Sequence, residues 1–401
     1  MKIMIHSNAV WASSGYGGQT RHLCQHLLKL GHQPAVSAFY GLQGTKMEAN
    51  GVAIYPVGLD GWGNDIIDSH ADNFGADMVI SLIDCWVLKD FGQKLPGRWY
   101  PWFPIDGEPI PESFKISLQG CMKAITMNQW SLKQAEKAGI TNAICIPHGV
   151  DTNIFRPLGK TRIESRKIAR DLLKIPDSTF LGIMVAANQS YPDRKAFTEQ
   201  LEAFAMFNKD HPDSLLYIHS DPLPNRGGLD LHLISKLVGA DDKVKFPQRY
   251  DYHLGFSEEE MCKLYNAADV LLSASAGEGF CIPIIEAEAC GIPVITNNCG
   301  GMPELTGAGW VVNWNHRMYY NLGNFHFRPN IKEIYQSLNK CYDANKEDLF
   351  KQAREFSMQY DWDHLMKKCW VPLLEEVKET KEKLSKTIKD KLEKEKVLIE
   401  V

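Results

Sequence analysis

The sequence predicts an α/β protein made of two doubly wound, parallel-sheet domains with a ligand cleft between them. Short apolar runs alternate with amphipathic helical segments along most of the 401 residues, which is typical of strands and crossover helices in a parallel sheet. The alternation is interrupted once, at 146–160, where two prolines and two glycines without periodicity indicate a linker. We therefore assign residues 1–150 to the first domain and 151–357 to the second.

The first domain should begin with a strand, a glycine-rich turn and a helix. Four leucines between Leu23 and Leu30 mark one face of that helix, and Gly31 suits the position just after its end. The strands expected in this domain are the apolar runs at 2–7, 34–39, 52–57, 77–83, 98–105, 123–127 and 143–147.

The second domain should repeat this organisation. Its expected strands are 179–187, 214–220, 243–247, 268–275, 292–297 and 309–313. Helices are expected near 161–173, 196–209, 229–238, 257–267, 283–290 and 331–343. Because open parallel sheets bind ligands at the carboxyl ends of their strands, the cleft between the two domains is the expected ligand site.

From about residue 361 the chain becomes helical and highly charged. Residues 375–401 form a charged helical tail with 8 Lys and 8 Asp or Glu, neutral in sum. A narrow apolar stripe runs along it, made of Val377, Leu384, Ile388 and Leu392. The stripe suits a solvated helix docked on the body, pairing with a partner helix or a second copy, or contact with a membrane surface.

Composition excludes several classes of protein. The net charge of −5 gives no basic bias of the kind that nucleic-acid binders show. No apolar run approaches the roughly 18 residues of a membrane helix, and MKIMIHSNAV is too short and polar for a signal peptide. Ten cysteines without a C-x-x-C pair indicate reduced thiols. We expect a cytoplasmic protein, with peripheral attachment to a membrane left open.

The segment 273–286, SASAGEGFCIPIIE, carries the strongest chemical signal. It follows an apolar strand and leads into a helix whose first turn accommodates Pro283. The turn between them lies where free backbone N–H groups and the helix dipole favour a phosphate. Glu278 and Glu286 bracket this turn. A carboxylate at each end can hold the two ends of a sugar nucleotide.

These residues resemble a known family. Glu278 and Glu286 form a Glu-x7-Glu motif that is similar to the signature of retaining glycosyltransferase family 4, whose members have the two-domain GT-B fold. Further segments that resemble the family are 12–32, 146–157, 193–197 and 360–365. The resemblance covers roughly residues 1–372. It implies that the first domain binds the acceptor, that the second binds a nucleotide sugar, and that a helix at 358–374 returns to the first domain.

The resemblance also implies roles for single residues. Glu278 would lie near the transferred sugar and Glu286 would bind the nucleotide ribose. Arg194 and Lys195 would neutralise the departing diphosphate, because fixed cations stabilise charge that develops in a transition state. The remaining donor-binding positions are Gly17 and Gly18, which would face the donor across the cleft, and the turn residues Gly279, Phe280, Cys281 and Ile282.

Asp106 and Cys281 depart from the family pattern, and Tyr250 is assigned only from its location in the chain. Asp106 follows the strand candidate 98–105 where related enzymes often have histidine. Its carboxylate would bind a sugar hydroxyl or accept the acceptor's proton, with a turn cap as the structural alternative. Cys281 stands where most relatives have glycine, and its side chain would narrow the donor-sugar pocket. Tyr250 is expected near the nucleotide base.

The sequence therefore predicts a retaining glycosyltransferase that moves a sugar from a UDP- or GDP-linked donor to a hydroxyl of a glycan, lipid-linked or other acceptor. We expect no cofactor and no metal, because two cations and a helix N-terminus can do a divalent metal's work. Two alternatives stay open: an inactive sugar-nucleotide or glycan-binding scaffold acting through the charged tail, and an inverting enzyme. A dehydrogenase is disfavoured, since 15–20 lacks the third glycine of G-x-G-x-x-G and 34–44 holds no acidic residue.

Overall fold

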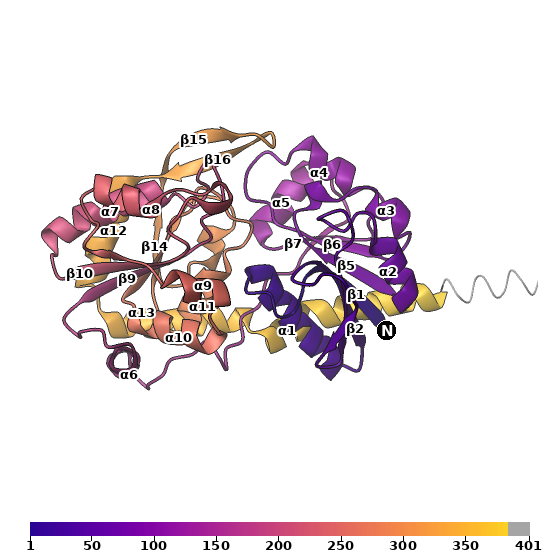
Figure 1. The fold of residues 1–401 in the computed structure, drawn as a ribbon, viewed down its shortest axis with the longest axis horizontal. Helices are drawn as coiled ribbons and strands as arrows, with labels where there is room; N and C mark the ends of the chain where they lie inside the picture. Colours follow the sequence, from indigo (N-terminus) through magenta and orange to yellow (C-terminus); the bar gives the residue numbers. More distant parts are fainter. Residues whose placement is uncertain (384–401) are drawn as a thin grey trace, which may run out of the picture.

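The computed structural model describes residues 1–383 and consists of two α/β domains, with a C-terminal helical segment that runs from the second domain back along the first (Figure 1). The first domain has an eight-stranded sheet in the order β3-β4-β2-β1-β5-β6-β7-β8. Its strands are β1 (Lys2–Asn8), β2 (Gln33–Tyr40), β3 (Met47–Ala49), β4 (Val52–Tyr55), β5 (Met78–Leu82), β6 (Trp99–Trp102), β7 (Ala124–Thr126) and β8 (Ala143–Cys145). All pair in parallel except β3, which is antiparallel to β4.

Helices cover both faces of this sheet. They are α1 (Gly15–Lys29), α2 (Ile67–Phe74), α3 (Phe91–Lys94), α4 (Glu112–Ser117) and α5 (Gln129–Lys137). Because successive strand residues face opposite ways, Ile3 and Ile5 join the core cluster that contains Leu23 of α1, while Met4 joins the one that contains Ile67 of α2. The near-continuous apolar strands found in the sequence are explained by this burial on both faces.

The second domain has a six-stranded parallel sheet in the order β11-β10-β9-β12-β13-β14. Its strands are β9 (Phe180–Val185), β10 (Ser214–His219), β11 (Val244–Lys245), β12 (Val270–Ser273), β13 (Val294–Asn297) and β14 (Gly309–Val312). Its helices are α6 (Arg162–Leu173), α7 (Phe197–Asp210), α8 (Leu231–Leu237), α9 (Arg249–Leu254), α10 (Glu258–Ala267), α11 (Ile282–Ala289), α12 (Ile331–Asp343) and α13 (Lys346–Ser357). The sequence signals mark these boundaries well: a capping box between Ser257 and Glu260 starts α10 where a helix was expected.

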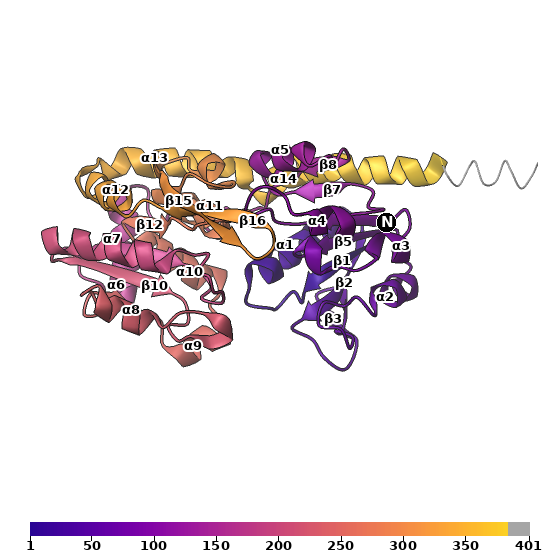
Figure 2. The same ribbon diagram turned by 90° about the horizontal axis from the view of Figure 1, so that it is seen from above.

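Several elements of the structure were not expected from the sequence, among them the short strand β3. An antiparallel hairpin, β15 (Trp314–Tyr320) and β16 (Asn324–Pro329), follows β14 and leaves the second sheet towards the first domain (Figure 2). Helices α9 and α13 were also missed. The strand expected at 98–105 is shorter, because Pro104 has no N–H to offer a neighbouring strand beyond Trp102.

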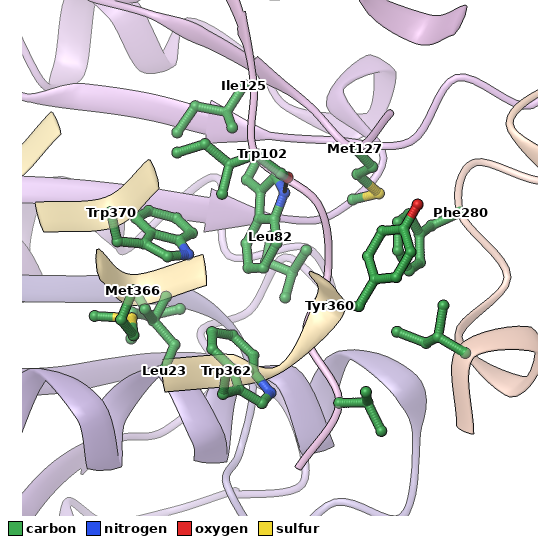
Figure 3. Packing of buried hydrophobic residues seen from close by; sticks show 14 of the residues in the cluster. Leu23, Leu82, Trp102, Ile125, Met127, Phe280, Tyr360, Trp362, Met366 and Trp370 are labelled. Atoms are coloured by element: carbon green, nitrogen blue, oxygen red, sulfur yellow. Dashed lines mark hydrogen bonds between the residues drawn. The ribbon is translucent and has the colours of Figure 1, made fainter. Parts of the chain in front are cut away.

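A C-terminal helical segment ties the domains together. It begins with α14 (Trp362–Leu365) and continues through residue 383 along the first domain (Figure 2). Trp362, Met366 and Trp370 are spaced four residues apart and all are buried. Trp370 packs edge-on against Trp102 at 5.1 Å between ring centroids, and Trp362 lies close to Leu23 of α1 (Figure 3). Of the predicted apolar stripe, Val377 lies in the described part and is buried; Leu384, Ile388 and Leu392 fall outside it.

Candidate active site

The turn between β12 and α11 has unused backbone donors. The backbone N–H groups of residues 278–282 make no hydrogen bond to any described residue. α11 begins at Ile282, with Pro283 in its first turn, so these N–H groups gather at a helix N-terminus. Cys281 caps the helix with φ of +76°, a left-handed conformation that favours glycine. This explains physically why a glycine would be usual at that position.

Glu278 lies at the centre of an ion-pair cluster. Its carboxylate is 2.6 Å from Nζ of Lys195 and 3.0 Å from a guanidinium nitrogen of Arg194. Burial alone would raise the pKa of Glu278, but the charges of Lys195 and Arg194 outweigh that effect and hold it below its usual value. The structure thus brings together three of the residues singled out in the sequence, with both cations facing one carboxylate.

Asp106 of the first domain reaches the same cluster. Its Oδ2 lies 3.6 Å from Nε of Arg194, and its Oδ1 lies 3.7 Å from Nε2 of His326 on β16. Burial opposes ionisation, yet His326 and Arg194 together lower the pKa of Asp106 to about 2. Arg194 is therefore held between one carboxylate of each domain.

The two domains meet tightly around this cluster. A Cβ atom added at Gly277 would lie 2.2 Å from the carbonyl oxygen of Asp106, and one at Gly279 would lie 2.2 Å from Cβ of Pro104. Asn128 of the first domain donates a 2.6 Å hydrogen bond to the Gly279 carbonyl. No side chain larger than hydrogen fits at either glycine without moving the first domain.

Two residues near the cluster escaped the sequence analysis. Asp84 follows β5 as Asp106 follows β6, so both carboxylates stand at the carboxyl edge of the first sheet. Burial, followed by the negative charge of Asp106, raises the pKa of Asp84 to about 6. Tyr16, at the start of α1, is subject to the charges of Asp84, Arg194 and Asp106, and burial raises its pKa well above the usual value. A polar residue directly after an apolar strand was the signal that could have identified Asp84.

Glu286 stands about one turn into α11 and has a different environment. Tyr265 of α10 donates a 2.8 Å hydrogen bond to Oε2 of Glu286. Burial is the larger effect, and with the charge of Glu258 it raises the pKa of Glu286 to about 7 in spite of the Tyr265 bond. The two glutamates of the motif therefore differ in protonation: Glu278 is ionised by its cations, while Glu286 titrates near neutral pH.

Gly15, Gly17 and Gly18, expected in a turn before the first helix, lie instead in the first turn of α1, beside the second domain. A Cβ at Gly17 would lie 2.2 Å from the carbonyl oxygen of Ala12, so this position requires glycine for its own turn. A Cβ at Gly18 would lie 3.9 Å from both Arg21 and Glu258, a pair that links the two domains at 2.7 Å. Gly18 thus lies beside a contact between the domains.

The remaining predicted donor positions are placed as follows. The side chain of Phe280 is buried among His148 and Tyr360, and Ile282 lies against Gly15. Either residue would therefore reach a donor through its backbone. The thiol of Cys281 lies 3.2 Å from Oγ of Ser273. Tyr250 is 74% exposed on α9, and its place beside a base stays a prediction.

Among residues 1–383, no three His, Cys, Asp or Glu side chains are grouped so that they could hold a metal ion. None of the helices formed there has the length and apolar character needed to cross a membrane.

The chain is similar in sequence to known glycosyltransferases. Residues 182–319 match a family model described as glycosyl transferases group 1. An MMP alpha-(1->4)-mannosyltransferase of Mycolicibacterium hassiacum is 27% identical over 218 residues, which are 54% of this chain and 44% of the relative. A D-inositol 3-phosphate glycosyltransferase of Mycolicibacterium smegmatis is 25% identical over 234 residues, 58% of this chain and 47% of the relative. The matched segments thus span less than half of these relatives.

Solved structures extend the likeness to nearly the whole chain. A sucrose-phosphate synthase from Thermosynechococcus elongatus has a TM-score of 0.72 at 17% identity, covering 93% of this chain and 99% of that one. The HepE protein of Anabaena, solved in complex with UDP-glucose, has a TM-score of 0.65 at 16% identity, covering 94% of this chain and 100% of that one. The GT-B fold expected from the sequence is confirmed.

Proposed function

We propose that the chain is a retaining glycosyltransferase that transfers a sugar from a nucleotide diphosphate sugar to a hydroxyl acceptor. The observation that carries the proposal is the meeting of Arg194, Lys195 and Glu278 with Asp106 where the two domains touch. The match of residues 182–319 to the group 1 model and the naming of both curated relatives as transferases support the same activity.

The donor would bind on the second domain. Its diphosphate would lie against the unused N–H groups of residues 278–282 and the α11 N-terminus, with Arg194 and Lys195 beside it. Both cations are paired with Glu278, so a diphosphate would compete with that carboxylate for them. Glu286 would accept hydrogen bonds from the ribose. The UDP-glucose bound by the HepE protein supports a UDP-linked donor, with GDP as the alternative.

The leaving group would help the acceptor react. As the sugar–phosphate bond breaks, negative charge grows on the diphosphate, and fixed cations stabilise that charge. A phosphate oxygen on the same face of the sugar would then take the acceptor's proton, which gives retention of configuration. Asp106, with a pKa of about 2, is a weak base, so we assign it the role of binding a sugar hydroxyl.

The proposal includes transfer without a metal ion. Arg194, Lys195 and the helix N-terminus supply positive charge where the diphosphate would lie, which is the task a divalent cation performs in other transferases. Transfer should therefore proceed at the same rate in EDTA and in added Mg²⁺ or Mn²⁺. Strict dependence on a metal would contradict this part of the proposal.

A screen of UDP- and GDP-sugars by thermal shift, followed by a transfer and donor-hydrolysis assay, tests the function as a whole. A donor at 100 times its Kd should stabilise the protein by about 2.7 kcal/mol. Binding without transfer or hydrolysis would favour the inactive scaffold. The anomeric configuration of the product, read by NMR, separates a retaining enzyme from an inverting one.

A further inference from the structure

The β15–β16 hairpin connects the two domains at the reaction centre. At its base, the Phe327 N–H donates a 2.7 Å hydrogen bond to the carbonyl of Ala276, beside the donor-binding turn. Towards its tip, the Phe325 N–H donates a 2.9 Å bond to the carbonyl of Glu108 in the first domain. Figure 1 shows the hairpin running from the second domain across to the first. Residue 326 is therefore held between two anchored neighbours.

A second anchor fixes the end of β16 to the rest of the second domain. The guanidinium of Arg328 contacts the carboxylate of Glu199 on α7 and the carbonyl oxygen of Asp193. Asp193 directly precedes Arg194 and Lys195, so β16 and the cationic pair share a support. A shift of the hairpin would therefore displace Arg194 and Lys195 as well.

His326 points from this strand into the site. Its ring is fully buried and stacks on Tyr320, with centroids 4.4 Å apart and planes 23° apart. A Cβ at Gly277 would lie 3.1 Å from Cδ2 of His326, so the ring borders the donor-binding turn. Its Nε2 lies 3.7 Å from Oδ1 of Asp106.

Neither ring nitrogen of His326 has a hydrogen-bond partner among residues 1–383. A buried donor or acceptor without a partner is costly, and native proteins rarely keep one without a purpose. Movement of a few tenths of an ångström would turn the 3.7 Å contact into a hydrogen bond from Nε2–H to Asp106. The imidazole is thus placed to fix a carboxylate that sits on the other domain.

We propose that His326 is a positioning residue of the transfer reaction, which orients the Asp106 carboxylate across the domain interface. This inference rests on the proposed function. Asp106 receives Arg194 at one oxygen and His326 at the other, so its plane and position are determined by two groups of the second domain. These two contacts therefore hold the carboxylate in place to bind a sugar hydroxyl.

The test compares His326→Leu with His326→Gln. Leucine removes the N–H, and kcat is expected to fall on the order of 100-fold, as misplacement by about 1 Å can cost. Glutamine places an amide N–H near the position of Nε2 and should restore most of that loss. Affinity for UDP or GDP should change less than about threefold, since His326 contacts Asp106, which would bind the sugar, and none of the groups assigned to the diphosphate or the ribose.

The matched control is His316→Leu, because His316 is an exposed histidine of the same hairpin that pairs across from Arg328. This variant should keep wild-type kcat and KM. In a cycle with Asp106→Asn, His326→Leu should cost little further activity. Wild-type kcat in His326→Leu, equal losses in the leucine and glutamine variants, or full additivity with Asp106→Asn would each overturn the positioning role.

A readout independent of turnover separates this inference from the proposed function. The carboxyl ¹³C signal of Asp106 should titrate at higher pH in His326→Leu than in wild type and in His316→Leu. An unchanged titration overturns the role of His326. An altered titration in a protein that neither binds nor transfers any nucleotide sugar would support the positioning contact while contradicting the function.

Discussion

Tyr265 of α10 donates a 2.8 Å hydrogen bond to Glu286 of α11, so the carboxyl group that we assign to the ribose is held by a phenol. The pKa of Glu286, about 7, predicts that the affinity for the nucleotide sugar depends on pH. The ionised carboxylate accepts stronger hydrogen bonds from ribose than the acid. Affinity for a nucleotide sugar, whose diphosphate does not titrate in this range, should rise as pH increases through 7, and calorimetry between pH 6 and 8 would measure it.

Two variants check the assignment of that titration. Glu286→Gln should weaken donor binding at pH 8 by about fivefold and flatten the profile, since roughly 1 kcal/mol separates charged from neutral hydrogen bonds. Tyr265→Phe removes a donor that lowers the pKa of Glu286, so its profile should move to higher pH. A profile that Glu286→Gln leaves unchanged would assign the titration to another group.

The raised pKa of Glu286 also predicts a stability effect. The folded state binds this proton more tightly than the unfolded chain, whose carboxyl has a pKa near 4.5. The resulting stabilisation is complete below pH 4.5 and is lost as pH rises through about 7. Urea denaturation should therefore show that Glu286→Gln gains stability relative to wild type between pH 5 and 8, and equal differences at both pH values would refute the effect.

Removing one cation should impair transfer without unfolding the protein. Lys195→Met keeps the length of the side chain but deletes the charge 2.6 Å from Glu278. We expect kcat/KM to fall by about 10²–10³, as for loss of one transition-state donor. Lys209→Met, at the exposed end of α7, is the control and should behave like wild type. Normal turnover in Lys195→Met would contradict the assignment of Lys195 to the diphosphate site.

Cys281 should be replaceable by glycine. Its left-handed conformation strains a residue with a Cβ by about 1–2 kcal/mol. Cys281→Gly relieves that strain while losing the contact with Ser273, and its Tm should stay within a few degrees of wild type. Cys281→Val keeps the strain and adds a β-branch, so scanning fluorimetry should give it a lower Tm. The reverse order would mean that the thiol contact dominates.

Trp362 should be a major determinant of stability. It is buried, and its ring stacks on His26 with centroids 5.5 Å apart. Trp362→Ala should cost about 3–5 kcal/mol in the free energy of unfolding, measured by urea denaturation. Met358→Ala, at a position 42% exposed, is the control and should cost much less. A small effect at Trp362 would show that the C-terminal segment is not integral to the fold.

The sequence was most informative where apolar runs are buried on both faces, as in β1 and β12. It was least informative at the hairpin, because β15 is largely exposed and its polar residues obscure the strand pattern. The glycine-containing turn 321–323, between Tyr320 and Asn324, was the available signal.

The candidate site, too, could be predicted from the sequence only in part. Glu278, Arg194 and Lys195 lie in motifs, so the sequence could group them. His326 joins them through a contact with Asp106 between elements that are far apart in the chain, and no local spacing encodes such a contact. Asp84 lacked a motif, although its place after an apolar strand was a local signal. The different environments of Glu278 and Glu286 depend on Lys195 and Tyr265, which only the fold brings to them.

The packing of Trp370 on Trp102 has a consequence for how the protein is made. The first domain leaves the ribosome first, yet part of its core comes from the last segment of the described chain. At 5–20 residues per second, roughly ten to forty seconds separate the linker from that segment. During this interval the nascent first domain exposes the apolar surface that Trp362, Met366 and Trp370 later cover. The domain synthesised first is thus completed last, and cleavage at the linker could not release it intact.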